Sequence, residues 1–130
     1  DISSSSLGYI DWYDYEDLDG QTAVTTLGIN IATENGMICV TSAGNSGNDG
    51  IIAPADAFEV ISVGAVDWNG ELTWFSSRGP TADGRIKPEV CARNPEIINH
   101  LKVVIRTRTS LVFLNNFTIS KIKNINPTIQ

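Results

Sequence analysis

The sequence contains few of the residues on which several classes of protein depend. Two cysteines, Cys39 and Cys91, are too few for a disulfide framework, and neither stands at the spacing of a metal site. Uninterrupted apolar runs are four residues or fewer, too short for a membrane-spanning helix or for the apolar region of a signal peptide. We predict no metal, no cofactor and no membrane partner. Because the chain opens at Asp1 without a methionine, we expect its true N-terminus to lie upstream, and the localisation stays open.

Glycine and acidic residues are nearly absent from one end of the chain. All 11 glycines lie before residue 85, and residues 93–130 contain no Gly, Ala, Asp or Trp. Residues 1–92 hold 14 of the 15 acids and 3 of the 9 bases, whereas residues 93–130 hold one acid and six bases. The composition changes at Ala92, so we predict a domain at 1–92 followed by a divergent tail at 93–130.

The basic tail admits more than one interpretation. Its charges stand singly among Ile, Val, Leu and Phe, which disfavours a nucleic-acid-binding arm, and we predict no nucleic-acid partner. A segment rich in Ile and Asn and free of glycine is typical of a shifted or read-through reading frame in AT-rich DNA. The alternative is a genuine, divergent pair of strands, because Lys102–Thr107 and Ser110–Leu114 have strand-like composition.

Apolar patterns in the first 92 residues predict strands that alternate with a helix. Asp1–Gly8 is typical of a short strand, and Met37–Thr41 and Val60–Val66 are typical of buried parallel strands. The turn Asp67–Gly70 carries an Asn-Gly pair and predicts a hairpin with Glu71–Ser76. Strand, helix and strand joined by glycine turns predict an α/β fold with a mainly parallel sheet.

The predicted helix covers about Gln21–Glu34 and ends at Gly36. Its apolar residues recur at three- and four-residue spacing, which predicts one apolar stripe. The stripe consists of Ala23, Val24, Leu27, Ile31 and Ala32.

Two loops suggest ligands that their spacing excludes. Aligning the acidic, aromatic loop Asp11–Gly20 to a calcium-binding EF-hand would put Tyr15 at the first ligand position and Thr26 at the twelfth, so we interpret the loop as solvated, with acids near a helix start. The three glycines of the loop 44–50 are spaced three apart and no lysine follows, which fits neither a dinucleotide fingerprint nor a P-loop.

Five short segments, with Ser6-Leu7-Gly8 upstream of them, span about 90 of the 130 residues. In chain order they are Val40-Thr-Ser-Ala-Gly-Asn45-Ser-Gly, Ile52-Ala-Pro54-Ala, Val60-Ile-Ser-Val-Gly-Ala-Val-Asp67, Phe75-Ser-Ser-Arg-Gly-Pro80 and Gly84-Arg-Ile-Lys-Pro-Glu-Val90. In the same order they are similar to the "AAGN" strand, the proline turn, "VIAVGAVD", "FSSRGP" and "KPDVVAPG" of subtilisin-like serine proteases. The chain therefore resembles the central part of that family.

The resemblance implies a role for two parts of the chain. In the family, the asparagine that matches Asn45 donates a hydrogen bond to the oxyanion of the tetrahedral intermediate. Ser6, Leu7 and Gly8, with Ala43 and Gly44, match the two segments that line the primary substrate pocket. The alternative interpretations are a turn-forming asparagine and ordinary strand-end turns.

The catalytic triad of the family has no match in this sequence. Nothing precedes Asp1 to carry its aspartate and histidine, Arg93-Asn94 stand where Pro-Gly is expected, and no Gly-Thr-Ser follows. His100 lacks the family's His-Gly-Thr context. The sequence therefore predicts a truncated, partial subtilisin-like fold. It would be a fragment of a serine endopeptidase, inactive alone, whose intact relative acts on peptides or proteins and is secreted if it follows the family.

Two further interpretations stay open. The chain could be a non-catalytic remnant that binds peptides or another protein through exposed strand edges. It could also be a degenerate gene product without a selected role.

Overall fold

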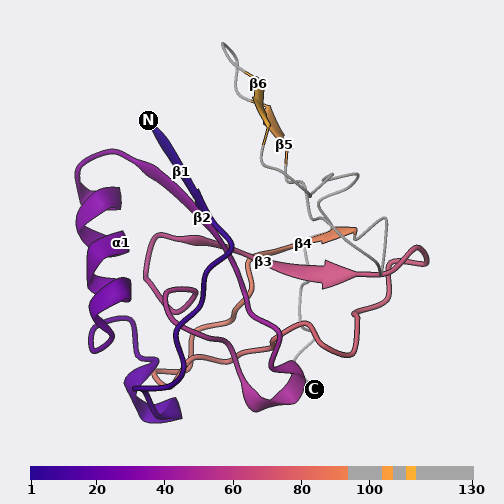
Figure 1. The fold of residues 1–130 in the computed structure, drawn as a ribbon, viewed down its shortest axis with the longest axis horizontal. Coiled ribbons are helices and arrows are strands. Elements are labelled where there is room, and N and C mark those ends of the chain that lie inside the picture. The colour runs from indigo at the N-terminus through magenta and orange to yellow at the C-terminus, as the bar shows by residue number, and fades with distance from the viewer. Residues whose placement is uncertain (94–103, 107–110, 114–130) are drawn as a thin grey trace.

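A four-stranded parallel sheet organises the protein. The computed structural model describes residues 1–93, 104–106 and 111–113. The strands lie in the order β1-β2-β3-β4, and each pair is parallel (Figure 1). Along the chain the elements are β1 (Ile2–Ser5), η1 (Tyr15–Asp17), α1 (Val24–Glu34), β2 (Ile38–Ser42), η2 (Gly47–Asp49), β3 (Ile61–Val66) and β4 (Val90–Arg93). The fold confirms the predicted α/β class with a mainly parallel sheet.

Two short strands of the tail form a separate pair. β5 (Val104–Arg106) and β6 (Leu111–Phe113) pair antiparallel with each other, inside the two segments of strand-like composition. β4 ends at Arg93, one residue beyond the predicted boundary at Ala92, and pairs that residue with Val66.

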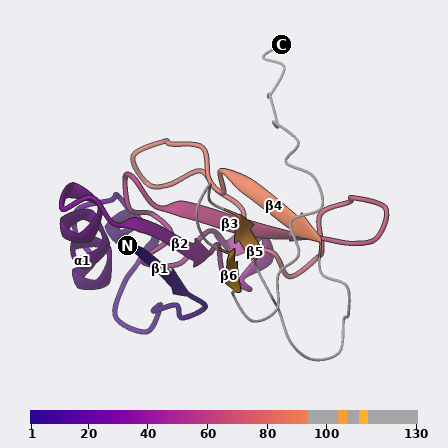
Figure 2. The same cartoon turned by 90° about the horizontal axis from the view of Figure 1, so that it is seen from above.

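The hydrophobic core of the main sheet lies between α1 and the strands. Cys39, Ala57 and Val60 are buried together, and Ile29 and Ala32 of α1 pack against them. Figure 2 shows α1 on the β1–β2 side of the sheet. Most residues of β2 and β3 are buried, and these two strands are correspondingly rich in apolar residues, as is usual for parallel sheets with both faces covered.

The helix begins three residues later than predicted. Asp19 accepts hydrogen bonds from the backbone N–H groups of Gln21 (2.7 Å) and Thr22 (2.8 Å) and from the Thr22 hydroxyl (2.9 Å). These bonds hold a turn ahead of the helix, so the first helical residue is Val24. They also lower the pKa of Asp19. The helix ends as predicted, with Gly36 at a φ of 83° just after the C-cap.

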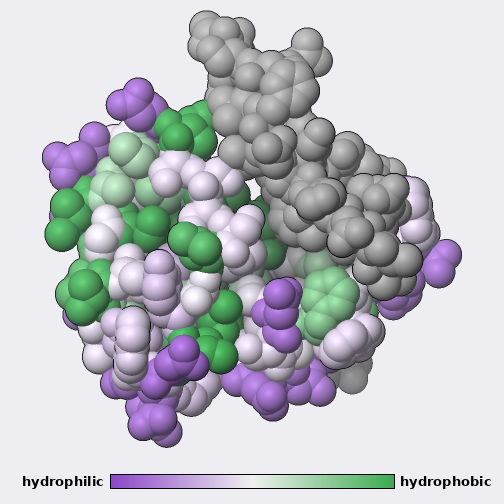
Figure 3. All heavy atoms as spheres, in the orientation of Figure 1, coloured by the Kyte–Doolittle hydropathy of each residue, from purple (hydrophilic) through white to green (hydrophobic). Residues whose placement is uncertain are grey.

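The predicted apolar stripe of α1 is buried only in part, since Ala23 is fully buried and Ala32 packs against the core. Val24 (72% exposed), Leu27 (41%) and Ile31 (60%) face outward, and apolar atoms are visible on the α1 side of Figure 3. Thr26, in contrast, is fully buried because its hydroxyl donates to Asp56. Asn30 also turns inward, bonding to Gly20 and Phe58. The hydrogen bonds of Thr26 and Asn30 therefore determine which face of α1 packs against residues 20 and 56–58.

The predicted hairpin after β3 closes its turn but forms no second strand. Asp67 and Glu71 are joined by a backbone bond of 2.8 Å, and one bridge links Val66 to Leu72. Beyond Thr73 the backbone no longer pairs with β3, because Phe75 O and Ser77 N–H bond to the glycine turn after β2. The Ser76 side chain still accepts a hydrogen bond from Ala65 of β3. Among the described residues, no helix has the length and apolarity to cross a membrane.

Candidate functional site

The predicted site residues lie in the two segments that follow the carboxyl ends of the neighbouring strands β1 and β2. β1 and β2 run parallel with Ser5 opposite Thr41, so the segments that follow them emerge side by side. Ser6, Leu7 and Gly8 are exposed after β1. After β2, Ala43 is buried, Gly44 is half-buried and Asn45 is exposed. The carboxyl ends of parallel strands are where α/β folds place their binding groups.

The side chain of Ile52 lies against both segments. A Cβ added to Gly8 would stand 1.9 Å from Ile52 Cδ1, and one added to Gly44 would stand 2.7 Å from Ile52 Cγ1. Backbone bonds strengthen this link, because Ile52 N–H donates to Ala43 O (3.2 Å) and Tyr9 N–H donates to Ala53 O (2.9 Å). Gly8 and Gly44 are thus brought together around one half-buried isoleucine.

Sequence reasoning did not single out Ile52. It precedes Pro54 in a segment noted only as a proline turn, and nothing local marks it as the neighbour of two distant glycines. The glycines themselves were the available signal, since a glycine often marks a close approach of backbone to another group.

The turn that carries Asn45 requires glycine at several positions. Gly44, Gly47 and Gly50 have φ values of 116°, 56° and 109°, which side chains rarely adopt. A Cβ at Gly44 would also stand 2.7 Å from Ser77 Oγ, and one at Gly47 would stand 2.9 Å from Trp74 O. The spacing of these glycines follows from a tight turn packed on residues 74–78, not from a phosphate-binding loop.

Residues 75–78 hold this turn by hydrogen bonds. Gly47 N–H donates to Phe75 O (2.9 Å), and Arg78 N–H donates to Gly47 O (3.1 Å). The Arg78 guanidinium donates to Asn48 Oδ1 at 2.7 Å. The segment that resembles "FSSRGP" is therefore a support for the turn after β2.

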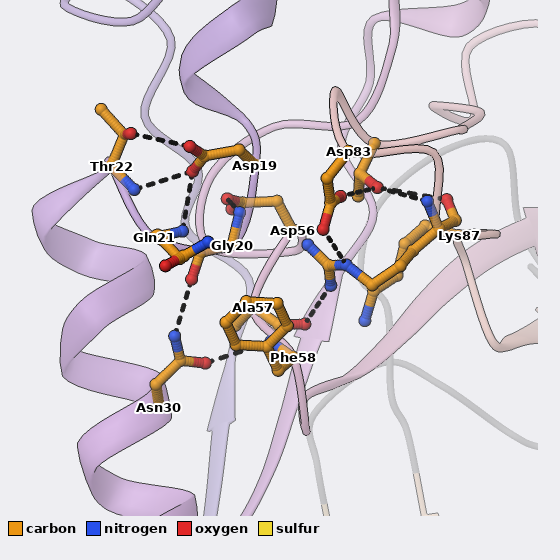
Figure 4. A network of polar contacts seen from close by, with 12 residues as sticks. Asp19, Gly20, Gln21, Thr22, Asn30, Asp56, Ala57, Phe58, Asp83 and Lys87 are labelled. Carbon is orange, nitrogen blue, oxygen red and sulfur yellow. Dashed lines mark hydrogen bonds and ion pairs between the residues drawn. The ribbon is translucent and has the colours of Figure 1, made fainter.

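A second polar network supports the loop that carries Ile52. Asp56 is fully buried and accepts hydrogen bonds from Gly20 N–H (3.0 Å) and from Thr26 Oγ1 (2.5 Å), as Figure 4 shows in part. Arg85 donates to Asp83 (2.7 Å) and to Ala57 O (3.3 Å), and its guanidinium lies 4.5 Å from the centre of the Phe58 ring. The bond from Arg85 lowers the pKa of Asp83. The network joins the start of α1 to residues 56–58.

Lys87 is a buried cation behind the same loop. Its ammonium donates to Val60 O (3.2 Å) and pairs with Glu89. Burial lowers the pKa of Lys87, and the Glu89 carboxylate opposes that shift. The bond to Val60 O joins the segment before β4 to the residue that precedes β3.

One serine lies beside a carboxylate, but it is not placed to react. Ser62 Oγ donates to Glu89 at 2.6 Å, and Ser62 N–H donates to the same oxygen at 2.7 Å. Ser62 is fully buried within β3, so this contact is structural. His100 lies outside the described residues. Within the residues that the structure describes, no group of three metal-binding side chains occurs.

Comparison with known proteins identifies the relatives of the chain. A model described as "Subtilase family" matches residues 1–117. The predicted boundary at Ala92 lies inside this range, and the division of the chain there stays a prediction. Serine protease AprX of Bacillus subtilis is 37% identical over 109 residues, covering 76% of this chain and 24% of AprX. The membrane-bound transcription factor site-1 protease of Homo sapiens is 32% identical over 98 residues, covering 69% of this chain and 9% of that protein.

Two solved structures share the fold. The prenylagaramide maturation protease PagA gives a TM-score of 0.52 at 24% identity, covering 88% of this chain and 36% of PagA. The S41 psychrophilic protease gives a TM-score of 0.54 at 24% identity, covering 72% of this chain and 31% of that one. The chain thus spans about a quarter of the length of AprX and about a third of these two structures.

Proposed function

This chain belongs to the subtilase family as part of a subtilisin-like serine protease, and we propose that it supplies the oxyanion donor and part of the substrate-binding surface. The donor is Asn45, and the surface is formed by Ser6, Leu7 and Gly8 with Ala43 and Gly44. In the complete enzyme these residues would serve the hydrolysis of peptide bonds through an acyl-enzyme.

The observation that supports this proposal is that Gly8 and Gly44 both lie against the side chain of Ile52. Gly44 is the residue directly before Asn45, so the donor stands beside this contact. The exposed segment Ser6-Leu7-Gly8 would offer its backbone to an extended peptide, which can pair with it as an added strand. Ala43 O and Gly44 O already accept hydrogen bonds within the protein, so that second segment would form a wall of the surface. Ile52 would limit the size of a substrate side chain entering between the two segments. Asn45, exposed at the end of this surface, would meet the carbonyl that reacts.

The chemistry suits an asparagine. Its amide NH₂ is a neutral donor that does not titrate, so it can face a developing negative charge at any working pH. A donor already held in place stabilises the tetrahedral intermediate more than the planar substrate, and this difference lowers the barrier. Nucleophile, base and the group that orients the base would come from other parts of the protease.

A transition-state analogue tests the role of Asn45 in the chain itself. Two matched peptides are titrated into ¹⁵N-labelled protein, one with an ordinary amide and one with an anionic tetrahedral phosphonamidate in its place. We expect tighter binding of the phosphonamidate, and a loss of about tenfold in that preference in Asn45→Ala, because hydrogen bonds to charged groups contribute on this scale. Asn69→Ala, which changes an exposed asparagine in the turn that follows β3, is the control.

The outcomes separate the interpretations. Equal preference in the unmutated chain and in Asn45→Ala would refute the oxyanion role. Binding of both peptides without any preference for the phosphonamidate would favour a peptide-binding remnant.

We further expect the purified 130-residue chain to hydrolyse no peptide. An oxyanion donor without a paired nucleophile and base contributes only part of the acceleration. A fluorogenic peptide assay and a fluorophosphonate probe check this. Time-dependent labelling of any serine that disappears on denaturation would contradict the expectation.

A further inference from the structure

We propose that Ser77 is the positioning residue for Asn45, holding the peptide groups on both sides of that asparagine. The inference rests on the proposed role of Asn45 as oxyanion donor. It assigns to a buried serine of the 75–78 segment the task of setting the direction of the donor amide.

Two hydrogen bonds from one residue bracket Asn45. Ser77 N–H donates to Gly44 O at 3.0 Å, which holds the peptide group before Asn45. Ser46 N–H donates to Ser77 Oγ at 2.9 Å, which holds the peptide group after it. Because peptide groups are planar, holding both leaves the backbone of Asn45 little freedom, and only the side-chain torsions remain.

The surroundings of Ser77 make these bonds persistent. Ser77 is fully buried, so water does not compete for its hydroxyl. Its Oγ would stand 2.7 Å from a Cβ on Gly44, so the turn and the serine fit only because residue 44 has no side chain. An oxyanion donor has to be held in place before the reaction, and this contact supplies that constraint.

Ser76 provides a matched comparison within the same segment. It is also buried, and its Oγ also accepts one backbone N–H bond, from Ala65 of β3 at 2.9 Å. Replacing Ser76 by alanine therefore removes a buried hydroxyl that accepts a backbone N–H from the sheet. It removes no hydrogen bond to the residues on either side of Asn45.

The test compares Ser77→Ala and Ser76→Ala in the full chain. We expect Ser77→Ala to lower the preference for the phosphonamidate peptide over the amide peptide about three- to tenfold, as the loss of one hydrogen bond implies. Exchange of the Ser46 amide should speed up about tenfold. Ser76→Ala should leave both quantities unchanged, although it costs comparable stability.

A second variant and a measurement on the unmutated chain protect the test against misfolding. Ser77→Cys fills the site with a somewhat larger sulfur atom that is a weak acceptor, so it should lower the preference as Ser77→Ala does. An unprotected Ser46 amide in the unmutated chain would overturn the inference without any variant.

The remaining outcomes distinguish this inference from the proposed function. If Asn45→Ala lowers the preference while Ser77→Ala and Ser77→Cys do not, the positioning role is wrong and the oxyanion role stands. If Asn45→Ala has no effect, the oxyanion role itself fails, whatever the Ser77 variants do.

Discussion

Alanine at position 45 is expected to lower kcat about 10²–10³-fold, with little change in KM, in a complete protease that contains this chain's turn. The magnitude is the one known for the corresponding asparagine of subtilisin and is taken over from that enzyme. The loss should fall on kcat because the amide contacts charge that develops only in the transition state.

A hybrid enzyme allows this measurement. Residues 1–92 replace the matching segment of the serine protease AprX, and kcat and KM are determined on one peptide substrate. Asn69→Ala in the same hybrid is the control, since Asn69 is an exposed asparagine in the turn that follows β3. A rise in KM with kcat unchanged would assign Asn45 to ground-state binding and contradict the prediction.

Removal of the buried carboxyl group at position 56 is expected to cost about 3–5 kcal/mol of stability. Asp56→Ala leaves Gly20 N–H and Thr26 Oγ1 without their partner in a site with no exposed surface. A loss of this size approaches the whole stability of a small domain. The variant should therefore be largely unfolded, with the loop that carries Ile52 released from the start of α1.

Urea unfolding followed by circular dichroism measures this effect. Asp49→Ala serves as the matched control, because Asp49 is exposed and such changes usually alter stability by less than about 0.5 kcal/mol. Asp56→Asn, which keeps one acceptor oxygen, should fall between the two. Equal unfolding midpoints for Asp56→Ala and Asp49→Ala would show that the buried bonds do not support the fold.

Local patterns determined the elements of this protein. The apolar runs Met37–Thr41 and Val60–Val66 form β2 and β3, because buried parallel strands are apolar along their length. Gly36 follows the end of the helix, because the left-handed backbone at that position favours glycine. The resemblance of "TSAGNSG" and "FSSRGP" to the subtilase family likewise came from short segments, and the family match confirms it.

Tertiary structure decided the orientation of those elements. The spacing of Val24, Leu27 and Ile31 placed them on one apolar stripe with Ala23 and Ala32. These three residues are nevertheless exposed, and the hydrogen bond between Thr26 and Asp56, 30 residues apart, turns another face inward. The second hairpin strand was lost for a similar reason, since Phe75 and Ser77 bond to the turn after β2.

The candidate site shows the same division. The sequence alone determined Asn45 as a candidate, together with the two glycine-containing segments beside it. Only the tertiary structure revealed that Ile52 lies between Gly8 and Gly44. It also revealed that Ser77 bonds to the peptide groups on both sides of Asn45. Both contacts join residues far apart in the chain, and close packing and hydrogen bonds between distant segments leave no periodic pattern in the sequence from which they could be predicted.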